Sequence, residues 1–361
     1  MKHISEMETI LSGFFNWHKT RVHCLVQILQ ALFCVRTVNL TQIAAAFQTK
    51  AKEASAYRRV CRFFTGFSFD LSLIVSLVLK LFPFEGKYTL IMDRTNWKWG
   101  KSPINILMIS VAYLGIGIPI FWAVLDLEGN SSVSDRITLL NRVLSKFGID
   151  KIEVFVADRE FVGKEWFHFL TEQNIPFMIR VKKNFLAEGI CSDCTLPLKT
   201  LCRRLGRNRK LENFPVKLWG KELYISVRKT KGSKDPLIVA ANREFKNPLG
   251  VYRRRWEIET LFGCLKTRGF RMEDTHLIDE NKIEKLVFVL AIAFCWSYRV
   301  GEIKVQNSPT EVKAHGRKAK SIFREGLDLI RRSLFRIRGG IKDFRQLLLC
   351  FQHSELGGYV L

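Results

Sequence analysis

Apolar residues recur along the chain at two spacings, and the change of spacing divides it into regions. Up to about residue 80 they recur every three or four positions, as in "FNWHKTRVHCLVQILQALFCV" and "NLTQIAAAFQTKAKEASAYRRVCRFFTGF", which predicts helices. In the second stretch Asn39 or Thr41 can cap a short helix, and a turn near Thr49–Lys50 leads into a basic helix that includes Arg62. Two short helices, the second basic, are typical of a DNA-binding module. An ordinary helical bundle with a charged face is an equally good interpretation.

From about residue 88 short apolar runs replace the helical spacing and predict strands. We expect strands in "YTLIMD", near Asn105–Tyr113 and Pro119–Leu125, then a helix at Ser134–Lys146, a strand in "IEVFVAD", a helix at Lys164–Gln173 and a strand in "PFMIRV". Strands that alternate with helices in this order predict an α/β core.

Two longer apolar runs resemble membrane spans, but one is interrupted and the other is too short. "INILMISVAYLGIGIPIFWAVLDL" is interrupted by Gly115, Gly117 and Pro119, so two buried strands joined by a turn fit it better. "LVFVLAIAFCW" is too short to cross a bilayer, and we expect it to lie in a buried helix at Lys282–Val300. Neither run predicts a membrane protein.

Three further segments complete the chain. Residues from Lys182 to about Ser233 are basic and broken, with short β-like pieces that predict an insertion. "VYRRRWEIETLFGCLKTRGF" (Val251–Phe270) predicts a helix, and the basic segment "HGRKAKSIFREGLDLIRRSLFRIRGG" lies near the C-terminus.

The composition predicts an anionic partner. The 361 residues carry 58 Lys and Arg against 34 Asp and Glu, a formal net charge of +24. Such a protein usually meets a polyanion, nucleic acid first and an anionic membrane second. The nine cysteines, densest at Cys191, Cys194 and Cys202, predict isolated thiols rather than disulfides or a zinc site. The N-terminus lacks the pattern of a signal peptide, so we expect a soluble, cytoplasmic protein.

Three carboxylates lie at positions that indicate a common ligand site. Asp93 and Asp158 each follow an apolar strand run, and the carboxyl ends of parallel strands are where α/β proteins bind ligands. The helix at Val251–Phe270 adds Glu259. Converging carboxylates repel one another unless cations neutralise them, and hard oxygen ligands suit Mg²⁺. Two such ions about 4 Å apart can activate an attacking oxygen and stabilise a leaving one in phosphoryl transfer.

The same helix carries other polar residues beside Glu259. At about 100° per residue, Tyr252, Arg255, Glu259 and Lys266 fall within roughly 60° of one another. Taken alone, a solvated face with an Arg–Glu pair explains this stripe. Glu257 lies about 160° from Glu259 around the axis, so both cannot face one site.

These residues together resemble a known family. Asp93, Asp158 and Glu259, with the spacing Tyr252-x2-Arg255-x3-Glu259-x6-Lys266, resemble the DDE transposases of bacterial insertion sequences, specifically the fourth insertion-sequence family with its Y-R-E-K signature. "DRTNWKWG" and "VADREF" are similar to that group's sequence around its two aspartates. The resemblance runs from Tyr88 to about Arg271, with a helical region before it.

The resemblance implies an α/β fold: a ribonuclease-H-like catalytic core, with a mixed sheet and flanking helices, interrupted by a β-rich insertion. We therefore expect a helical DNA-end-binding region at 1–84, the core at 85–181 and 234–300, the insertion at 182–233, and a basic helical region at 301–361. It further implies catalytic and metal-binding roles for Asp93, Asp158 and Glu259, with two Mg²⁺ ions for which Mn²⁺ can substitute.

The resemblance also implies partners. Tyr252, Arg255 and Lys266 would contact phosphates near the transposon end. Arg94 is a further candidate for DNA contact. Trp219 is the candidate for stacking on a flipped base, although Phe185 and Phe214 compete with it and a role in the core is the alternative for each of the three. The implied activity is cut-and-paste transposition at terminal inverted repeats of double-stranded DNA, by a homodimer on paired ends in the bacterial nucleoid.

Two other interpretations stay open. A catalytically inactive, transposase-derived DNA-binding protein would have no use for three clustered carboxylates. A general nuclease of the same fold would not account for the Y-R-E-K stripe. We assign His168 and His276 structural roles, because neither has a partner at metal-ligand spacing. The sequence leaves open the repeat sequence, the target preference, a hairpin intermediate and whether this copy is active.

Overall fold

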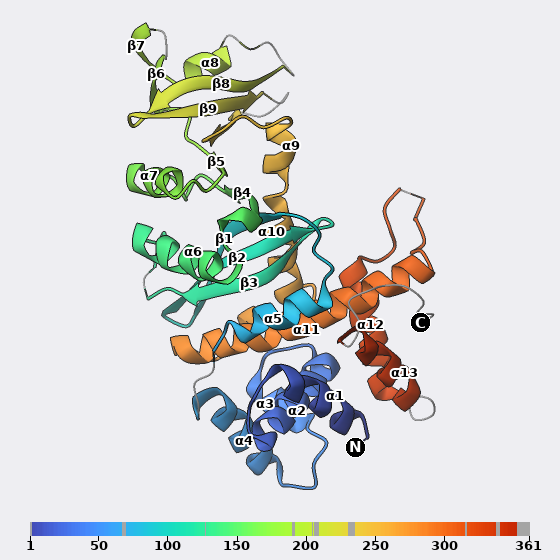
Figure 1. Cartoon of the computed structure of the whole chain (residues 1–361). Helices are drawn as coiled ribbons and strands as arrows, with labels where there is room; N and C mark the ends of the chain where they lie inside the picture. Colours follow the sequence, from blue (N-terminus) through green and yellow to red (C-terminus); the bar gives the residue numbers. More distant parts are fainter. Residues whose placement is uncertain are drawn as a thin grey trace. The chain divides into compact units, whose positions relative to one another are not determined.

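The chain folds into two compact units. The computed structural model describes residues 2–66, 70–126, 128–189, 192–203, 205, 209–229, 235–314, 316–336 and 340–351 (Figure 1). The helical unit comprises Met1–Glu85, Asn96–Asn105 and Phe262–Leu361, and the sheet unit comprises Gly86–Thr95 and Ile106–Leu261.

The helical unit combines helices from both ends of the chain. They are α1 (Lys2–Phe14), α2 (Lys19–Val35), α3 (Leu40–Ala45), α4 (Glu53–Thr65), α5 (Leu73–Leu81), η2 (Met272–Asp274), α11 (Glu280–Asn307), α12 (Ile322–Phe335), α13 (Gly340–Leu348) and η3 (Leu349–Phe351). The predicted pair of short helices is confirmed as α3 and α4. Asn39 caps α3, because its side-chain oxygen accepts hydrogen bonds from the backbone N–H groups of Thr41 and Gln42.

Helix α11 is the core of this unit. Every residue from Lys285 to Ile303 is buried, and α2, α4, α5 and α12 pack around the helix. The predicted buried helix at Lys282–Val300 is therefore confirmed. By length and composition α11 could also cross a membrane, but its apolar window is 100% buried inside the protein, as in the core helix of a soluble protein.

Two glycines let α11 and α12 approach each other closely. A Cβ atom added to Gly326 of α12 would lie 1.8 Å from the carbonyl oxygen of Ser297 in α11. A Cβ atom on Gly301 of α11 would lie 1.9 Å from the carbonyl oxygen of Ile322. Both distances are far below van der Waals contact, so any side chain at either position forces the two helices apart.

We therefore expect Gly326→Ala to lower the free energy of unfolding by about 1–3 kcal/mol or more, through overpacking. Gly13→Ala is the matched control, because Gly13 lies in α1 with nothing within 4 Å of an added Cβ atom. That control should leave stability unchanged or raise it by about 0.5–1 kcal/mol, since alanine favours helices. Urea denaturation measures both, and equal stability of Gly326→Ala and wild type would contradict the close crossing.

The strands that the structure describes form one mixed sheet. They are β1 (Tyr88–Trp99), β2 (Ser102–Tyr113), β3 (Ile116–Val124), β4 (Ile152–Ala157), β5 (Phe177–Arg180), β6 (Leu186–Gly189), β7 (Ser192–Pro197), β8 (Lys210–Leu218), β9 (Lys221–Arg228) and β10 (Leu237–Ala241). In the described part of the chain their order is β3-β2-β1-β4-β5-β10-β9-β8-β6-β7. A mixed sheet with flanking helices agrees with the ribonuclease-H-like core that the sequence resemblance implies.

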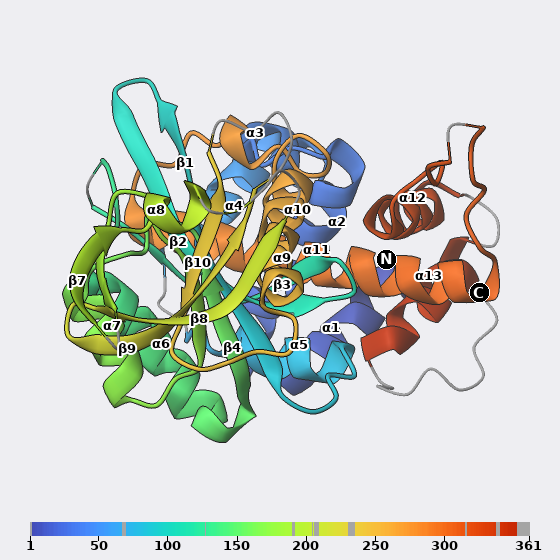
Figure 2. The same cartoon turned by 90° about the horizontal axis from the view of Figure 1, so that it is seen from above.

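The predicted core elements are present in the predicted order. Strands β2 and β3 form an antiparallel hairpin, so the long apolar run is two buried strands joined by a turn, as expected. Helix α6 (Val133–Phe147) precedes β4, and α7 (Lys164–Glu172) precedes β5. Figures 1 and 2 show α6 and α7 on one side of the strands of this unit, and α9 (Pro248–Arg253) on the other side.

The predicted end of the first strand is wrong. We expected it to end at Asp93, but β1 continues to Trp99, before a turn in which Gly100 has a φ of +57°. β2 is a hydrogen-bonded neighbour of β1 in the sheet. Pairing with a neighbouring strand, which local apolar spacing does not report, keeps the polar residues after Asp93 extended.

The segment predicted as an insertion contains β6 to β9 and α8 (Lys199–Arg203). Its strands join the main sheet, because β10 pairs with β5 on one side and with β9 on the other. Whether the segment is an insertion into the core stays a prediction, as do the five predicted regions. Cys194 and Cys202 carry free thiols, as expected, while Cys191 lies outside the described residues.

Candidate functional site

Two parallel strands deliver Asp93 and Asp158 to the same edge. In the β1–β4 ladder Met92 is the partner of Ala157, and this is the last pair of the ladder. Asp93 and Asp158 are the next residue on each strand. The sequence therefore placed the two carboxylates correctly relative to the parallel pairing, although β1 itself continues beyond Asp93.

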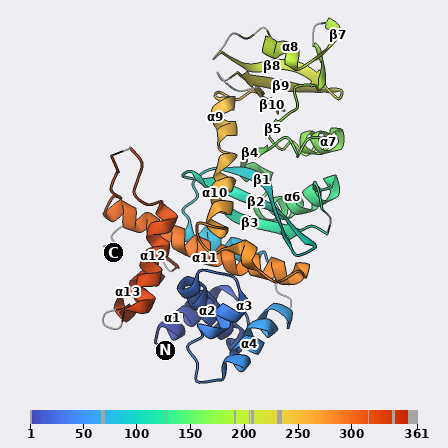
Figure 3. The ribbon, with the colours of Figure 1, turned by 180° about the vertical axis from the view of Figure 1, so that it is seen from behind.

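The helix that carries the Y-R-E-K residues is broken in two. A single helix over Val251–Phe270 was predicted, but α9 ends at Arg253 and α10 (Trp256–Leu265) begins after a short turn. In the turn the backbone N–H of Arg255 bonds to the carbonyl of Tyr252 at 3.0 Å, and that of Glu257 bonds to the carbonyl of Arg254 at 2.9 Å. These bonds span three residues rather than four, so the chain is locally wound more tightly than an α-helix. Figure 3 shows the two helices in succession.

Arg254 fixes this turn against the sheet, and sequence reasoning missed it. Its guanidinium donates to the hydroxyl of Thr89 at 2.7 Å and to the carbonyl of Ala112 at 2.9 Å. It also lies 3.4 Å from the carboxylate of Glu257. Contacts to β1 and β2 pull the backbone out of a regular helix, and nothing in helical periodicity reveals such contacts. They also explain why Glu257 is directed away from Glu259, as expected.

Arg255 lies between two of the predicted catalytic carboxylates. One nitrogen of its guanidinium is 3.1 Å from Asp93 Oδ2, and the other is 2.5 Å from Glu259 Oε1. The guanidinium also lies 4.6 Å from the ring centre of Trp256. Arg255 is 5% exposed, so this charge is largely removed from water. A buried arginine needs such partners, because an unpaired charge in the interior is costly.

Tyr252 and Arg180 hold the third carboxylate. The hydroxyl of Tyr252 donates to Asp158 Oδ1 at 3.3 Å, and a nitrogen of Arg180 lies 3.8 Å from the same oxygen. Tyr252 is 3% exposed. The structure thus brings together five of the predicted site residues: Asp93, Asp158, Tyr252, Arg255 and Glu259.

Burial and like charges perturb the acidity of the site. Burial is the main cause that raises the pKa of Asp93 to about 7; the N–H of Arg94 and the charge of Arg255 lower it, and Glu160 and Asp158 raise it. Burial also raises the pKa of Tyr252, as does Asp158. Burial alone would lower the pKa of Arg255, but Glu259, Tyr252, Asp93 and Asp158 outweigh it and raise the pKa. Carboxylates perturbed in this way are typical of functional sites.

The donor atoms suit a divalent cation, provided that Arg255 moves. Carboxylate oxygens are hard ligands of the kind that Mg²⁺ and Mn²⁺ prefer. In the residues that the structure describes, however, no three His, Cys, Asp or Glu side chains are arranged to hold a metal ion. The positive charge between Asp93 and Glu259 is that of Arg255. A metal role for the three carboxylates stays a prediction.

The remaining predicted residues have other partners. Arg94 pairs with Glu160, 3.2 Å away. Lys266 belongs to the helical unit, where it lies 2.7 Å from Glu273 and 5.8 Å from the ring centre of Trp97. Trp219 packs against Phe167 and Phe185, with ring centres 5.2 and 5.3 Å away.

The two histidines assigned structural roles both have structural contacts. His168 is within hydrogen-bond distance of the Trp219 carbonyl, and His276 stacks on Trp99. The contacts of Glu160 and Arg180 were not foreseen. Glu160 lies within "VADREF", but neither residue belongs to the Y-R-E-K signature or to the three predicted carboxylates.

Comparison with known families identifies the class of protein. A family model described as a transposase DDE domain matches residues 85–296, more than half of the 361 residues. The chain belongs to the DDE transposase family. DDE transposases generally use divalent metal ions and bind DNA. The match does not extend to the fourth insertion-sequence family in particular.

Other comparisons add little to the family assignment. No curated protein matches this transposase. Among solved structures it is similar to the crystal structure of endonuclease V from Bacillus subtilis, with 10% sequence identity and a TM-score of 0.26. That similarity covers 58% of the transposase and 83% of the endonuclease chain, and it is too low to establish a common fold.

The Arg254 contacts predict a measurable effect on the transposase. Arg254→Gln removes the hydrogen bonds to Thr89 and Ala112, so the free energy of unfolding should fall by about 1–3 kcal/mol. Arg253→Gln is the matched control, because its neighbour Arg253 is exposed and the charge change is the same. That variant should stay within about 0.5 kcal/mol of wild type in urea denaturation. Equal stability of the two variants would refute the role of Arg254.

Proposed function

We propose that the protein is an active insertion-sequence transposase of the Y-R-E-K group that performs cut-and-paste transposition. The observation that carries the proposal is the convergence of Asp93, Glu259 and Asp158 on Arg255 and Tyr252, all within the segment matched by the DDE domain. Asp93 and Glu259 share the guanidinium of Arg255, and the charge of Asp158 raises the pKa of Asp93, so repulsion among these carboxylates raises the energy of the folded state.

In this proposal Asp93, Asp158 and Glu259 hold two Mg²⁺ ions, or Mn²⁺ in their place. Such ions, when bound, activate an attacking oxygen and stabilise a leaving one in phosphoryl transfer. The first reaction is hydrolytic nicking at the terminal inverted repeats. The second is attack of the freed 3′-hydroxyl on target DNA. Hydrolysis breaks one P–O ester bond and forms one P–O bond to the oxygen of water, which leaves a free 3′-hydroxyl. Strand transfer breaks one P–O ester bond of the target and forms one to that 3′-oxygen, so no covalent enzyme intermediate is needed.

Arg255 and Tyr252 change partners when DNA binds. In the protein alone they neutralise and hydrogen-bond the carboxylates, which keeps the site folded. When metal ions take over that role, the arginine fork is free to grip a phosphate in a bidentate manner and the tyrosine to donate its hydroxyl. Lys266 adds a point charge near the same DNA end. Arg94 exchanges Glu160 for DNA in the same way.

The other regions serve assembly and recognition. The helices of residues 1–84 and the strands of 182–233 bind the inverted repeats, and residues 301–361 contribute to a homodimer that pairs two ends. Trp219 lies in the aromatic group with Phe167 and Phe185, so stacking on a flipped base would require its ring to leave that group. The protein acts in the bacterial cytoplasm, at the nucleoid.

One observation favours a second candidate. Arg255 already satisfies Asp93 and Glu259, as it would in a transposase-derived protein that binds DNA without cutting it. Such a protein would bind the terminal repeats with or without metal ions and would never nick them. A general nuclease would nick duplexes of any sequence.

Cleavage of a labelled duplex that carries the element's terminal repeat tests the proposal. Wild type should nick at the repeat boundary with Mg²⁺ and not with EDTA. Glu259→Gln should lose cleavage by at least about 100-fold while it still binds the duplex, because it removes an acidic oxygen from the reacting centre.

Glu257→Gln is the matched control for that variant. It lies on the same helix and makes the same chemical change, but its carboxylate contacts Arg254 rather than Arg255. It should cleave within a few-fold of wild type. Retained cleavage by Glu259→Gln would remove this residue from the site, and binding without cleavage by wild type would favour the non-catalytic candidate.

A further inference from the structure

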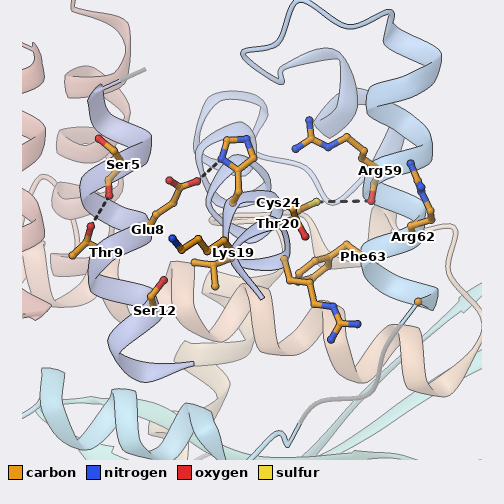
Figure 4. A pocket seen from close by; sticks show the side chains of 14 residues that line it. Ser5, Glu8, Thr9, Ser12, Lys19, Thr20, Cys24, Arg59, Arg62 and Phe63 are labelled. Atoms are coloured by element: carbon orange, nitrogen blue, oxygen red, sulfur yellow. Dashed lines mark hydrogen bonds and ion pairs between the residues drawn. The ribbon is translucent and has the colours of Figure 1, made fainter. Parts of the chain in front are cut away.

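Three arginines are buried among the residues that the structure describes: Arg136, Arg255 and Arg299. Arginines more often lie at the surface, as Arg62 of α4 does at the cleft of about 1180 Å³ that α1, α2 and α4 line (Figure 4). A buried guanidinium is costly unless its charge and its N–H groups are satisfied. Arg255 contacts the carboxylates of the candidate site, and Arg299 pairs with Glu302. Arg136 makes contacts of a different kind.

Arg136 donates to oxygens of two separate segments. Its Nη2 atom donates to the carbonyl of Ser131 at 2.7 Å and to the carbonyl of Glu160 at 3.2 Å. Its Nε atom donates to the hydroxyl of Ser131 at 2.9 Å. The guanidinium also lies 5.2 Å from the ring centre of Phe161, and Arg136 is 4% exposed. One side chain therefore joins the residues before α6 to the residues after β4.

The start of α6 is itself fixed by a capping box. The hydroxyl of Ser132 accepts a hydrogen bond from the N–H of Asp135 at 3.1 Å, and the carboxylate of Asp135 accepts one from the N–H of Ser132 at 2.8 Å. Arg136 is the next residue. Its bonds to Ser131 then fix the direction of the guanidinium, because the arginine fork is planar and rigid.

The segment on the other side of Arg136 is the turn that follows Asp158. The N–H of Phe161 donates to the carbonyl of Asp158 at 3.0 Å, so the residues from Asp158 to Phe161 form a closed turn. Arg136 binds the carbonyl of Glu160 in that turn, and the buried ring of Phe161 lies against the guanidinium. The backbone that carries Asp158 is thus held by β4 on one side and by Arg136 on the other.

We propose that Arg136 is a positioning residue: through the carbonyl of Glu160 it fixes the turn after β4 and so the direction of the Asp158 carboxylate. The inference rests on the proposed function in one respect, that Asp158 holds a divalent cation. Groups that orient a metal ligand through hydrogen bonds matter nearly as much as the ligand itself. Because Arg136 binds the backbone of Glu160, the turn stays fixed when Arg94 exchanges the carboxylate of Glu160 for DNA.

Arg136→Gln is the test variant, because it removes the hydrogen bonds that join Ser131 to Glu160. Arg142→Gln is the matched control, since Arg142 lies on the same helix, is exposed and loses the same charge. Ser131→Ala is a milder second variant, which removes the hydroxyl that accepts from Arg136 and keeps the guanidinium. Thermal denaturation of all three variants verifies that they are folded.

Cleavage is measured at saturating concentrations of Mg²⁺ and of the terminal-repeat duplex. Arg136→Gln should lower the rate constant of nicking by about 10–100-fold. Its affinity for the duplex should stay at the wild-type value, because Arg136 is buried away from any DNA surface. Ser131→Ala should show a smaller loss of rate, and Arg142→Gln should show none.

Mn²⁺ affinity is measured separately, from the electron paramagnetic resonance signal of free Mn²⁺, with a duplex that is already nicked at the repeat boundary. Arg136→Gln should bind Mn²⁺ at least about tenfold more weakly than wild type, because the carboxylate of Asp158 is no longer held in its direction. Ser131→Ala should bind it less weakly than Arg136→Gln does, and Arg142→Gln should bind it as wild type does.

A purely structural role of Arg136 would lower cleavage and duplex binding together, in proportion to the unfolded fraction, and leave the Mn²⁺ affinity of the folded protein unchanged. That outcome would overturn the proposal. So would equal cleavage and equal Mn²⁺ affinity of Arg136→Gln and Arg142→Gln. If Arg136→Gln does not fold, Ser131→Ala decides between these outcomes in the same measurements.

The proposed function can fail separately. Metal-dependent nicking by wild type alongside either overturning outcome would leave the transposase activity standing. Wild-type protein that binds Mn²⁺ but does not nick the duplex would refute that activity, and weaker Mn²⁺ binding by Arg136→Gln would then still support the positioning role.

Discussion

The guanidinium of Arg255 lies between the carboxylates of Asp93 and Glu259, and the arrangement around it depends on that contact. Neighbouring carboxylates repel one another, and burial already raises the pKa of Asp93 to about 7. A positive charge is therefore required for the folded site to exist with ionised carboxylates. In the protein alone Arg255 is that charge. Arg180 supplies a positive charge beside Asp158, and the neutral hydroxyl of Tyr252 donates a hydrogen bond to it.

The fold creates this constraint through backbone geometry. The β1–β4 ladder ends just before the two aspartates, and the turn between α9 and α10 directs Arg255 toward them. Gly117 of β3 allows the close approach of α10, since an added Cβ atom would lie 3.1 Å from the Cα atom of Ile258. Arg254 and Arg255 have different roles. Arg254 forms hydrogen bonds that hold the turn against the strands, and Arg255 forms hydrogen bonds to the carboxylates.

Local sequence patterns predicted the elements well and their tertiary adjustments poorly. Apolar runs predicted β2, β3, β4 and the buried helix α11, and Asn39 was foreseen as a cap, because each depends on neighbours in sequence. The extension of β1 past Asp93 depends on pairing with β2, and the break at Arg254 depends on contacts with Thr89 and Ala112. Spacing identified Tyr252, Arg255 and Glu259 as one group. It could not predict that Arg255 would face the carboxylates rather than solvent, because side-chain pairing across elements leaves no periodic signal.

The most direct test of this account is Mn²⁺ binding to the protein without DNA, followed by the electron paramagnetic resonance signal of free Mn²⁺. If Arg255 occupies the place of a divalent cation, Arg255→Gln removes a competitor. It should then bind Mn²⁺ at least about tenfold more tightly than wild type, since hydrogen bonds to charged groups contribute about 1.5–3 kcal/mol each. The further change Asp158→Asn should abolish that gain. Mn²⁺ affinity that is unchanged or weaker in a folded Arg255→Gln protein would contradict the account.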